Sequence, residues 1–98
     1  MVFNFTKGAE LNRPPFSQFG KTAMHLRLVF AINLKRLRSE RGLSQSNLAF
    51  RAGLNRSYLS RLENAKNDPR LEIVGKLAKV LGVTPAQLLT REQAHQSE

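Results

Sequence analysis

Glycines divide most of this chain into short segments with helical periodicity. Within each segment apolar residues recur every three or four positions, which is the spacing of one face of an α-helix. The segments stop at Gly42, Gly53 and Gly82, and glycine readily takes the left-handed conformation that ends a helix. No stretch alternates over a convincing length as a strand would. The pattern therefore predicts an all-α fold built from several short helices.

Five helices are expected from these segments and from the residues that can cap them. Ser44 and Asn55 are suited to be N-caps, because their side-chain oxygens can accept hydrogen bonds from the first turn. Thr84 followed by Pro85 is typical of a helix start, and a polar loop with Pro69 separates the third and fourth helices. The expected helices cover residues 25–41, 45–51, 55–64, 71–81 and 85–90.

The first part of the chain differs from the rest. Four of the six phenylalanines and the pair Pro14-Pro15 lie within the first twenty residues, and no helical period is present. Proline pairs favour extended backbone. We expect an extended or disordered arm over 1–23, one domain over 24–91 and a polar tail over 92–98. Two questions stay open: whether the arm docks on the domain or on a partner, and whether translation starts at Met24 instead.

The charge of the chain points to a polyanionic or acidic partner. Sixteen lysines and arginines stand against seven acidic residues, for a formal net charge of +9. Nucleic acid, an anionic membrane surface and an acidic protein all fit such a charge. A membrane-surface peptide would show one long basic amphipathic helix, whereas here the basic residues are spread over several short helices. This distribution favours nucleic acid.

The residues that most catalytic and metal sites require are missing or badly placed. There is no cysteine, which excludes a disulfide framework and a thiolate zinc site. His25 and His95 lie outside the compact pattern, and no catalytic triad, phosphate-binding glycine loop or metal-ligand spacing is present. We expect no enzyme, metal, cofactor or small-molecule ligand. No apolar run approaches the ~20 residues of a membrane span and no signal peptide is evident, so we expect a cytoplasmic protein.

The turn at Ala52-Gly53-Leu54 joins two of the short helices tightly. Two such helices must cross steeply if one of them is to enter the major groove of DNA. Ala49 is small enough for a close crossing, and Gly53 tolerates the positive φ that the turn needs. Leu59 and Leu62 would then hold the second helix on the core. Residues 44–64 are therefore interpreted as a helix-turn-helix.

The stretch from Leu34 to Leu89 resembles the Cro/repressor-type (XRE) helix-turn-helix family of bacterial and phage regulators. The matching run is LSQSNLAFRAGLNRSYLSRLENAK followed by NDPRLEIVGKLAKVLGVTPAQLL. The resemblance implies a five-helix, lambda-repressor-like DNA-binding domain that regulates transcription, for example as a repressor. The start of the third helix, Asn55-Arg56-Ser57-Tyr58, also resembles controller proteins of restriction-modification systems, but ordinary chromosomal regulators share it.

The resemblance implies roles for eight residues of the helix-turn-helix. The N-terminal part of the recognition helix meets base edges in this family, and the start of the preceding helix and the following loop hold phosphates. For Tyr58, half-buried packing is an equal alternative. The implied base contacts are Arg56, Ser57, Tyr58 and Arg61. The implied phosphate contacts are Gln45, Ser60, Asn64 and Lys66.

One pair of residues matches the family pattern outside the DNA-contacting positions, and one residue departs from it. Arg38 and Glu63 match a salt bridge that links the first helix to the end of the third, so their implied role is structural. The family usually has glycine after Asn64, and here the residue is Ala65. Either Asn64 takes the left-handed conformation instead, or the helix runs slightly longer.

A homodimer is expected, because one recognition helix reads too few base pairs for useful specificity. The resemblance places the dimer interface at the fifth helix, with Val83, Leu88 and Leu89; the alternative is that these residues only close the core of one chain. A second function remains open, a protein-interaction module such as an antitoxin that holds a partner protein. The phenylalanine-rich arm supports that alternative, because its aromatic side chains are suited to contact another protein.

Overall fold

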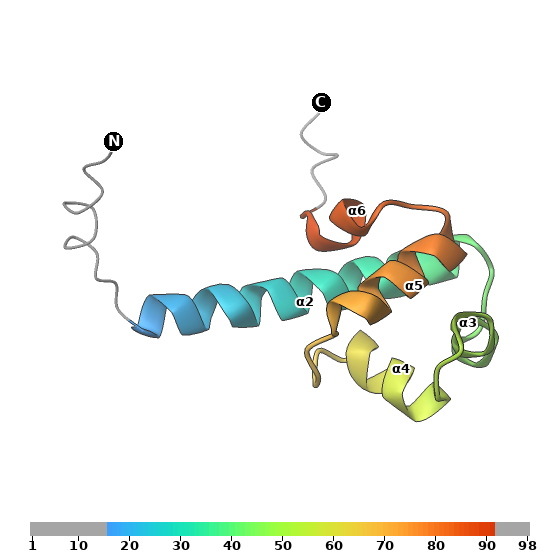
Figure 1. The fold of residues 1–98 in the computed structure, drawn as a ribbon, viewed down its shortest axis with the longest axis horizontal. Helices are drawn as coiled ribbons and strands as arrows, with labels where there is room; N and C mark the ends of the chain where they lie inside the picture. The colour runs from blue at the N-terminus through green and yellow to red at the C-terminus, as the bar shows by residue number, and fades with distance from the viewer. Residues whose placement is uncertain (1–15, 92–98) are drawn as a thin grey trace.

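The computed structural model of the chain describes residues 16–91, with side chains from His25 onward, and this part consists of helices and connecting turns without a strand. Figure 1 shows one long helix, with the shorter helices gathered around its C-terminal half. The helices are α2 Phe16–Glu40, α3 Gln45–Ala52, α4 Arg56–Glu63, α5 Leu71–Leu81 and α6 Pro85–Leu89. The all-α prediction with five helices is confirmed.

The expected N-caps are all in place. The Ser44 hydroxyl accepts a hydrogen bond from the Asn47 N–H at 2.9 Å, and the Asn55 side chain accepts one from the Ser57 N–H at 2.7 Å. Thr84 and Gln87 form a reciprocal capping box around Pro85, which satisfies two of the N–H groups that a helix start leaves unpaired. These bonds are made within four residues, so the helix starts are set by local sequence.

Helices α2 to α5 end in one recurring hydrogen-bonded turn, in which an N–H reaches back to the carbonyl five residues earlier. This is the Schellman motif, and it needs a residue with positive φ just before the donor. The four donor–acceptor pairs are Leu43–Arg38 at 3.1 Å, Leu54–Ala49 at 2.8 Å, Lys66–Arg61 at 2.9 Å and Val83–Ala78 at 3.0 Å. The positive-φ residues are Gly42, Gly53, Ala65 and Gly82.

The turn after α4 differs from both alternatives raised above. Asn64 has a φ of −101° and the helix ends at Glu63, while Ala65 itself takes a φ of 56°. The chain thus forms here the same turn as at the ends of α2, α3 and α5, but with a residue that carries a Cβ. Left-handed backbone costs such a residue roughly 1–2 kcal/mol, so the surrounding hydrogen bonds hold Ala65 in an unfavourable conformation.

Helix α2 begins earlier than the sequence indicated. It starts at Phe16, directly after the proline pair, rather than at His25. The expectation of an extended or disordered arm is therefore wrong for residues 16–23; the remainder of the arm, 1–15, and the tail, 92–98, lie outside the described residues. Proline is tolerated before and within the first turn of a helix, where its missing N–H is not needed. This end of α2 extends beyond the other helices (Figure 1).

The core is enclosed by all five helices: α2 packs against α4 and α6, α3 packs against α4 and α5, and α5 packs against α6. Phe30 and Leu34 of α2 are fully covered, and Leu77 of α5 lies in the same cluster. The polar side chain of Asn33 is also buried, and its amide donates to the carbonyls of Leu88 at 2.8 Å and Thr90 at 3.0 Å. Asn33 therefore fastens the end of α6 to α2.

Candidate nucleic-acid interface

The turn between α3 and α4 has the geometry that a helix-turn-helix needs. Gly53 takes a φ of 71°, and a Cβ added there would meet no atom within 4 Å. The glycine is therefore required by backbone conformation rather than by close packing. Leu54 follows it, half-buried against the core, and its N–H bonds to the Ala49 carbonyl. Ala49 itself is buried, as the steep crossing of two short helices requires.

Helix α4 has one face in the core and one in solvent. Leu59 and Leu62 are fully buried, whereas Arg56, Ser57 and Arg61 are exposed. Within the part of the chain that the structure describes, neither arginine forms an ion pair with an acidic side chain. These two guanidinium groups are therefore available to an anionic or hydrogen-bonding partner.

Tyr58 behaves differently from its neighbours on α4. Its side chain is half-buried and packs against the core cluster. The structure thus shows the packing that was one of the two alternatives for this residue, and leaves only part of the ring at the surface. Ser60 is also half-buried, and its carbonyl accepts a hydrogen bond from the Asn64 side chain at 2.9 Å.

A salt bridge joins the first helix to the end of α4, as the resemblance implied. Arg38 donates through Nε to Glu63 Oε2 at 2.6 Å and through Nη2 to Oε1 at 3.0 Å. The Glu63 side chain is only 2% exposed. The bond to Glu63 raises the pKa of Arg38 above its ordinary value. A third guanidinium bond, from Nη1 to the Leu43 carbonyl at 2.8 Å, holds the turn before α3.

Gln45 was expected to bind phosphate, and the structure ties it to this salt bridge. Its Nε2 donates to Glu63 Oε1 at 2.9 Å. A primary amide carries two hydrogens, so one remains for another acceptor. The bond to Glu63 fixes the side chain at the first position of α3, next to the N–H groups of its first turn.

The loop after α4 presents one exposed lysine and one asparagine that is already engaged. Asn64 Nδ2 lies within hydrogen-bond distance of both the carbonyl and the hydroxyl of Ser60. Lys66 is exposed and forms no ion pair within the described residues. Of the two residues expected to contact phosphate in this loop, Lys66 is the one with a charged group that is exposed and unpaired within the described residues.

The residues expected at a dimer interface are placed differently from one another. Leu88 is fully buried in the core of its own chain, so its assignment to the interface is wrong. Val83 and Leu89 are half-buried and pack against the same core. The physical reason is that α6 has only five residues. Such a short helix must turn its most central leucine inward to be held at all.

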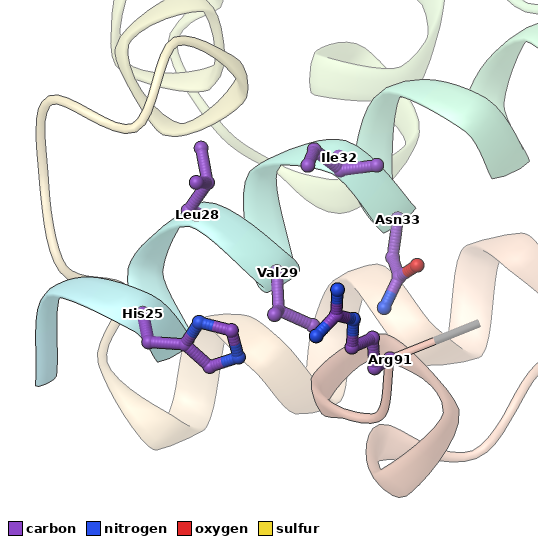
Figure 2. Close-up of a pocket in the computed structure, with 6 residues that line it drawn as sticks. All are labelled: His25, Leu28, Val29, Ile32, Asn33 and Arg91. Carbon is purple, nitrogen blue, oxygen red and sulfur yellow. The ribbon is translucent and has the colours of Figure 1, made fainter. Parts of the chain in front are cut away.

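A second apolar surface was missed in the sequence. His25, Leu28, Val29, Ile32 and Asn33 of α2 line a pocket of about 250 Å³ with Arg91, the last described residue. Figure 2 shows His25, Val29 and Asn33 on the side of α2 that faces Arg91. Leu28 and Ile32 are 48% and 57% exposed. Their spacing of four was a usable signal, because it places two apolar side chains on one helix face outside the core pattern.

Two kinds of feature are absent from the described residues. Between Phe16 and Arg91 no helix combines the length and the apolar character needed to cross a membrane. Side chains of the types that bind metal do not gather in groups of three or more in the described part of the chain.

The comparisons with known proteins agree with this geometry. The helix-turn-helix family model matches residues 34–88. An uncharacterized HTH-type transcriptional regulator, y4dJ of Sinorhizobium fredii, is 37% identical over 67 residues, which is 68% of this chain and 87% of the relative. Control protein C.BamHI of Bacillus amyloliquefaciens is 36% identical over 66 residues, or 66% of this chain and 82% of that protein.

Solved structures show the same fold. The crystal structure of the hypothetical transcription factor NHTF from Neisseria superposes with a TM-score of 0.68 at 38% identity, over 72% of this chain and 82% of that one. The restriction-modification controller protein C.AhdI from Aeromonas hydrophila gives a TM-score of 0.62 at 39% identity, over 63% of this chain and 94% of its own.

Proposed function

The chain belongs to the helix-turn-helix family, and we propose that it regulates transcription by binding a specific double-stranded DNA sequence with α4 in the major groove. One observation carries the proposal: α4 exposes Arg56, Ser57 and Arg61 on the face opposite its buried leucines. Side chains at the start of a recognition helix can therefore reach base edges while the core stays intact. The cytoplasmic location expected from the sequence belongs to the same proposal.

Base recognition rests mainly on the two arginines of α4. A guanidinium can bond both O6 and N7 of guanine, which is the commonest specific contact in the major groove. Arg56 stands at the first position of the helix and is assigned this role; Ser57 adds a contact to a neighbouring base. Arg61 lies about one turn further on and reaches a base or a phosphate. Tyr58 contributes only through the exposed part of its ring, to a thymine methyl or the backbone.

Phosphate contacts would flank α4 on both sides. Gln45 offers its second amide hydrogen at the start of α3, where the helix N-terminus favours an anion. Lys66 offers its ammonium group from the loop after α4. Ser60 and Asn64 are weaker contributors, since their polar groups already bond to each other. These contacts position the protein on DNA and carry no sequence information themselves.

Two copies would bind together, on half-sites about one helical turn apart. The surface that supports a homodimer is the apolar face of α2 with Leu28 and Ile32, next to the pocket at Arg91 (Figure 2). A second copy would cover both side chains. Val83 and Leu89 can contribute only the exposed parts of their side chains to this interface, and Leu88 contributes nothing because it is fully buried.

Selection of bound sequences from a random double-stranded DNA pool tests the proposal. The wild-type chain should enrich one sequence, in two half-sites related by symmetry. Arg56→Ala should lose about 1–3 kcal/mol of specific binding and relax the preference at one base per half-site. Lys35→Ala removes the same charge from α2, outside the helix-turn-helix, and should keep the preference.

Two results would contradict the assignment. No enrichment from the pool would remove sequence-specific binding altogether. An equal loss of affinity for all sequences in Arg56→Ala would make Arg56 a phosphate contact. The antitoxin alternative predicts instead a stoichiometric partner protein; the relatives described above are named as regulators and control proteins, and none is named as an antitoxin.

A further inference from the structure

A hollow lies between α3 and α5, at the end of α3 away from Gln45. Its volume is about 630 Å³ and it is shallow and open. Gln45 and Ala52 are the two ends of α3, so the hollow is roughly 10 Å along the helix from the proposed phosphate contact, at 1.5 Å per residue. The residues that line it are Phe50, Arg51, Ala52, Gly53, Lys76, Lys79 and Val80.

Phe50 is the most exposed large apolar side chain among the described residues, at 85%. Single exposed apolar residues are common and by themselves indicate nothing. Phe50, however, forms one wall of the hollow, and Ala52 and the half-buried Val80 line it as well. An aromatic ring beside a small apolar floor is the arrangement into which a partner's apolar side chain can insert.

The hollow is also positively charged. Arg51, Lys76 and Lys79 contribute three cations, and none of the seven lining residues is acidic. Lys76 has a weak exposed pair with Glu72 at 3.7 Å. Arg51 and Lys79 form no ion pair within the described part of the chain. Complementary charge selects partners and speeds their association, so this surface favours an acidic ligand.

We propose that this hollow binds a short acidic segment of a partner protein that carries one apolar anchor. The anchor would lie against Phe50 and Val80, and its flanking carboxylates would meet Arg51, Lys76 and Lys79. A DNA backbone would satisfy the cations but gains nothing from an aromatic ring, which is why an acidic peptide fits better. Because the hollow is at the opposite end of α3 from Gln45, such a partner could be held while α4 occupies DNA.

Selection from a displayed library of random 12-residue peptides, with the full chain as bait, tests this surface. The recovered peptides should share acidic residues around one aromatic or aliphatic residue. Phe50→Ala, and separately the double variant Lys76→Ala/Lys79→Ala, should each weaken their binding at least tenfold. Leu71→Ala is the matched control, because Leu71 is 84% exposed on α5 and does not line the hollow. It should bind the peptides as wild type does.

Measurements of DNA affinity distinguish this surface from the DNA interface proposed for α4. Phe50→Ala should leave DNA affinity within twofold of wild type, and its unfolding midpoint should not fall, since the side chain is exposed. The proposal is overturned if no acidic peptides are enriched, or if the variants bind them as tightly as wild type. The slope of DNA affinity against salt concentration reports how many phosphates the protein neutralises. The proposal is also overturned if this slope falls in Lys76→Ala/Lys79→Ala by the equivalent of about two phosphates, because the lysines would then face the DNA backbone.

Discussion

Ala65 is the described residue at which backbone conformation and side-chain type disagree. It occupies, with a φ of 56°, the position that glycine holds at the ends of α2, α3 and α5. The residue that follows it, Lys66, bonds to the Arg61 carbonyl at 2.9 Å, so the turn forms in spite of the strained residue. The energy stored here should be recoverable by a single substitution.

Ala65→Gly should stabilise the fold by about 0.5–1 kcal/mol, because relief of the left-handed conformation exceeds the added entropy of a glycine in the unfolded chain. Urea unfolding measures the difference. Gly53→Ala is the reciprocal control: it creates the same strain where a new Cβ meets no atom within 4 Å, and should destabilise by about 1 kcal/mol. A loss of stability in Ala65→Gly would show that the alanine methyl has a packing role.

At the scale of elements, α4 is held by a few bonds made at its end. Glu63 accepts from Arg38 of α2 and from Gln45 of α3. One buried carboxylate thus connects the recognition helix to both helices behind it. The orientation of α4 depends on this point as much as on the apolar face, since an apolar contact has no fixed direction.

Arg38→Met should cost about 3 kcal/mol, because it leaves the buried Glu63 carboxylate without its cation. Glu63→Leu should cost less, since Arg38 is close enough to the surface to be solvated. In the double variant the two costs should not add, because no buried charge is left unpaired. Unfolding free energies of the four chains measure the coupling. Additive costs would mean that the pair contributes no mutual stabilisation.

A second salt bridge between elements, Arg27–Asp68, is expected to make stability depend on pH. Arg27 of α2 donates to Asp68 in the loop before α5, at 2.6 and 3.2 Å, and this bond lowers the pKa of Asp68 below its ordinary value. A carboxyl group whose pKa is lower in the folded than in the unfolded chain stabilises the fold at any pH above its unfolded pKa, which is about 3.9 for aspartate. That stabilisation is lost as the pH falls through the lower pKa of the folded state.

The difference in unfolding free energy between wild type and Asp68→Asn should therefore be constant above about pH 5 and shrink toward zero as the pH falls below 4. Denaturant unfolding from pH 6 to pH 2.5 measures it. Repeating the comparison in an Arg27→Gln background should remove most of the pH dependence. A difference that does not change with pH in the wild-type background would mean that the ion pair does not form.

At the scale of the molecule, the question is whether the chain acts alone. The buried residues form one cluster that includes Leu88 of α6, so each chain closes its own core. The described surface nevertheless keeps Leu28 and Ile32 of α2 exposed. A dimer built there would join two complete domains and leave both recognition helices free.

Ile32→Glu should convert the proposed dimer to a monomer, because a carboxylate would be buried in the interface without a partner. Sedimentation equilibrium measures the oligomeric state, and binding to a full two-half-site DNA should weaken with it. Leu71→Glu places the same charge at an exposed leucine of α5 and should leave the dimer intact. A monomeric wild-type chain at high concentration would contradict the dimer, and a dimeric Ile32→Glu chain would place the interface elsewhere.

The sequence by itself determined the parts of this protein that depend on near neighbours. The ends of α3 to α6 were placed to within about a residue, because Ser44, Asn55, Gly53 and Gly82 act on backbone groups only a few residues away. The Arg38–Glu63 bridge and the identity of the recognition helix came from resemblance, since they match residues at set spacings. The exposed face of α4 then followed from its helical period.

Only the tertiary structure decided what depends on distant segments. No local pattern could reveal the burial of Leu88, the bond from Gln45 to Glu63, or the hollow beside Phe50. Burial and side-chain hydrogen bonds are set by segments up to 57 residues apart, as in the bond from Asn33 to Thr90.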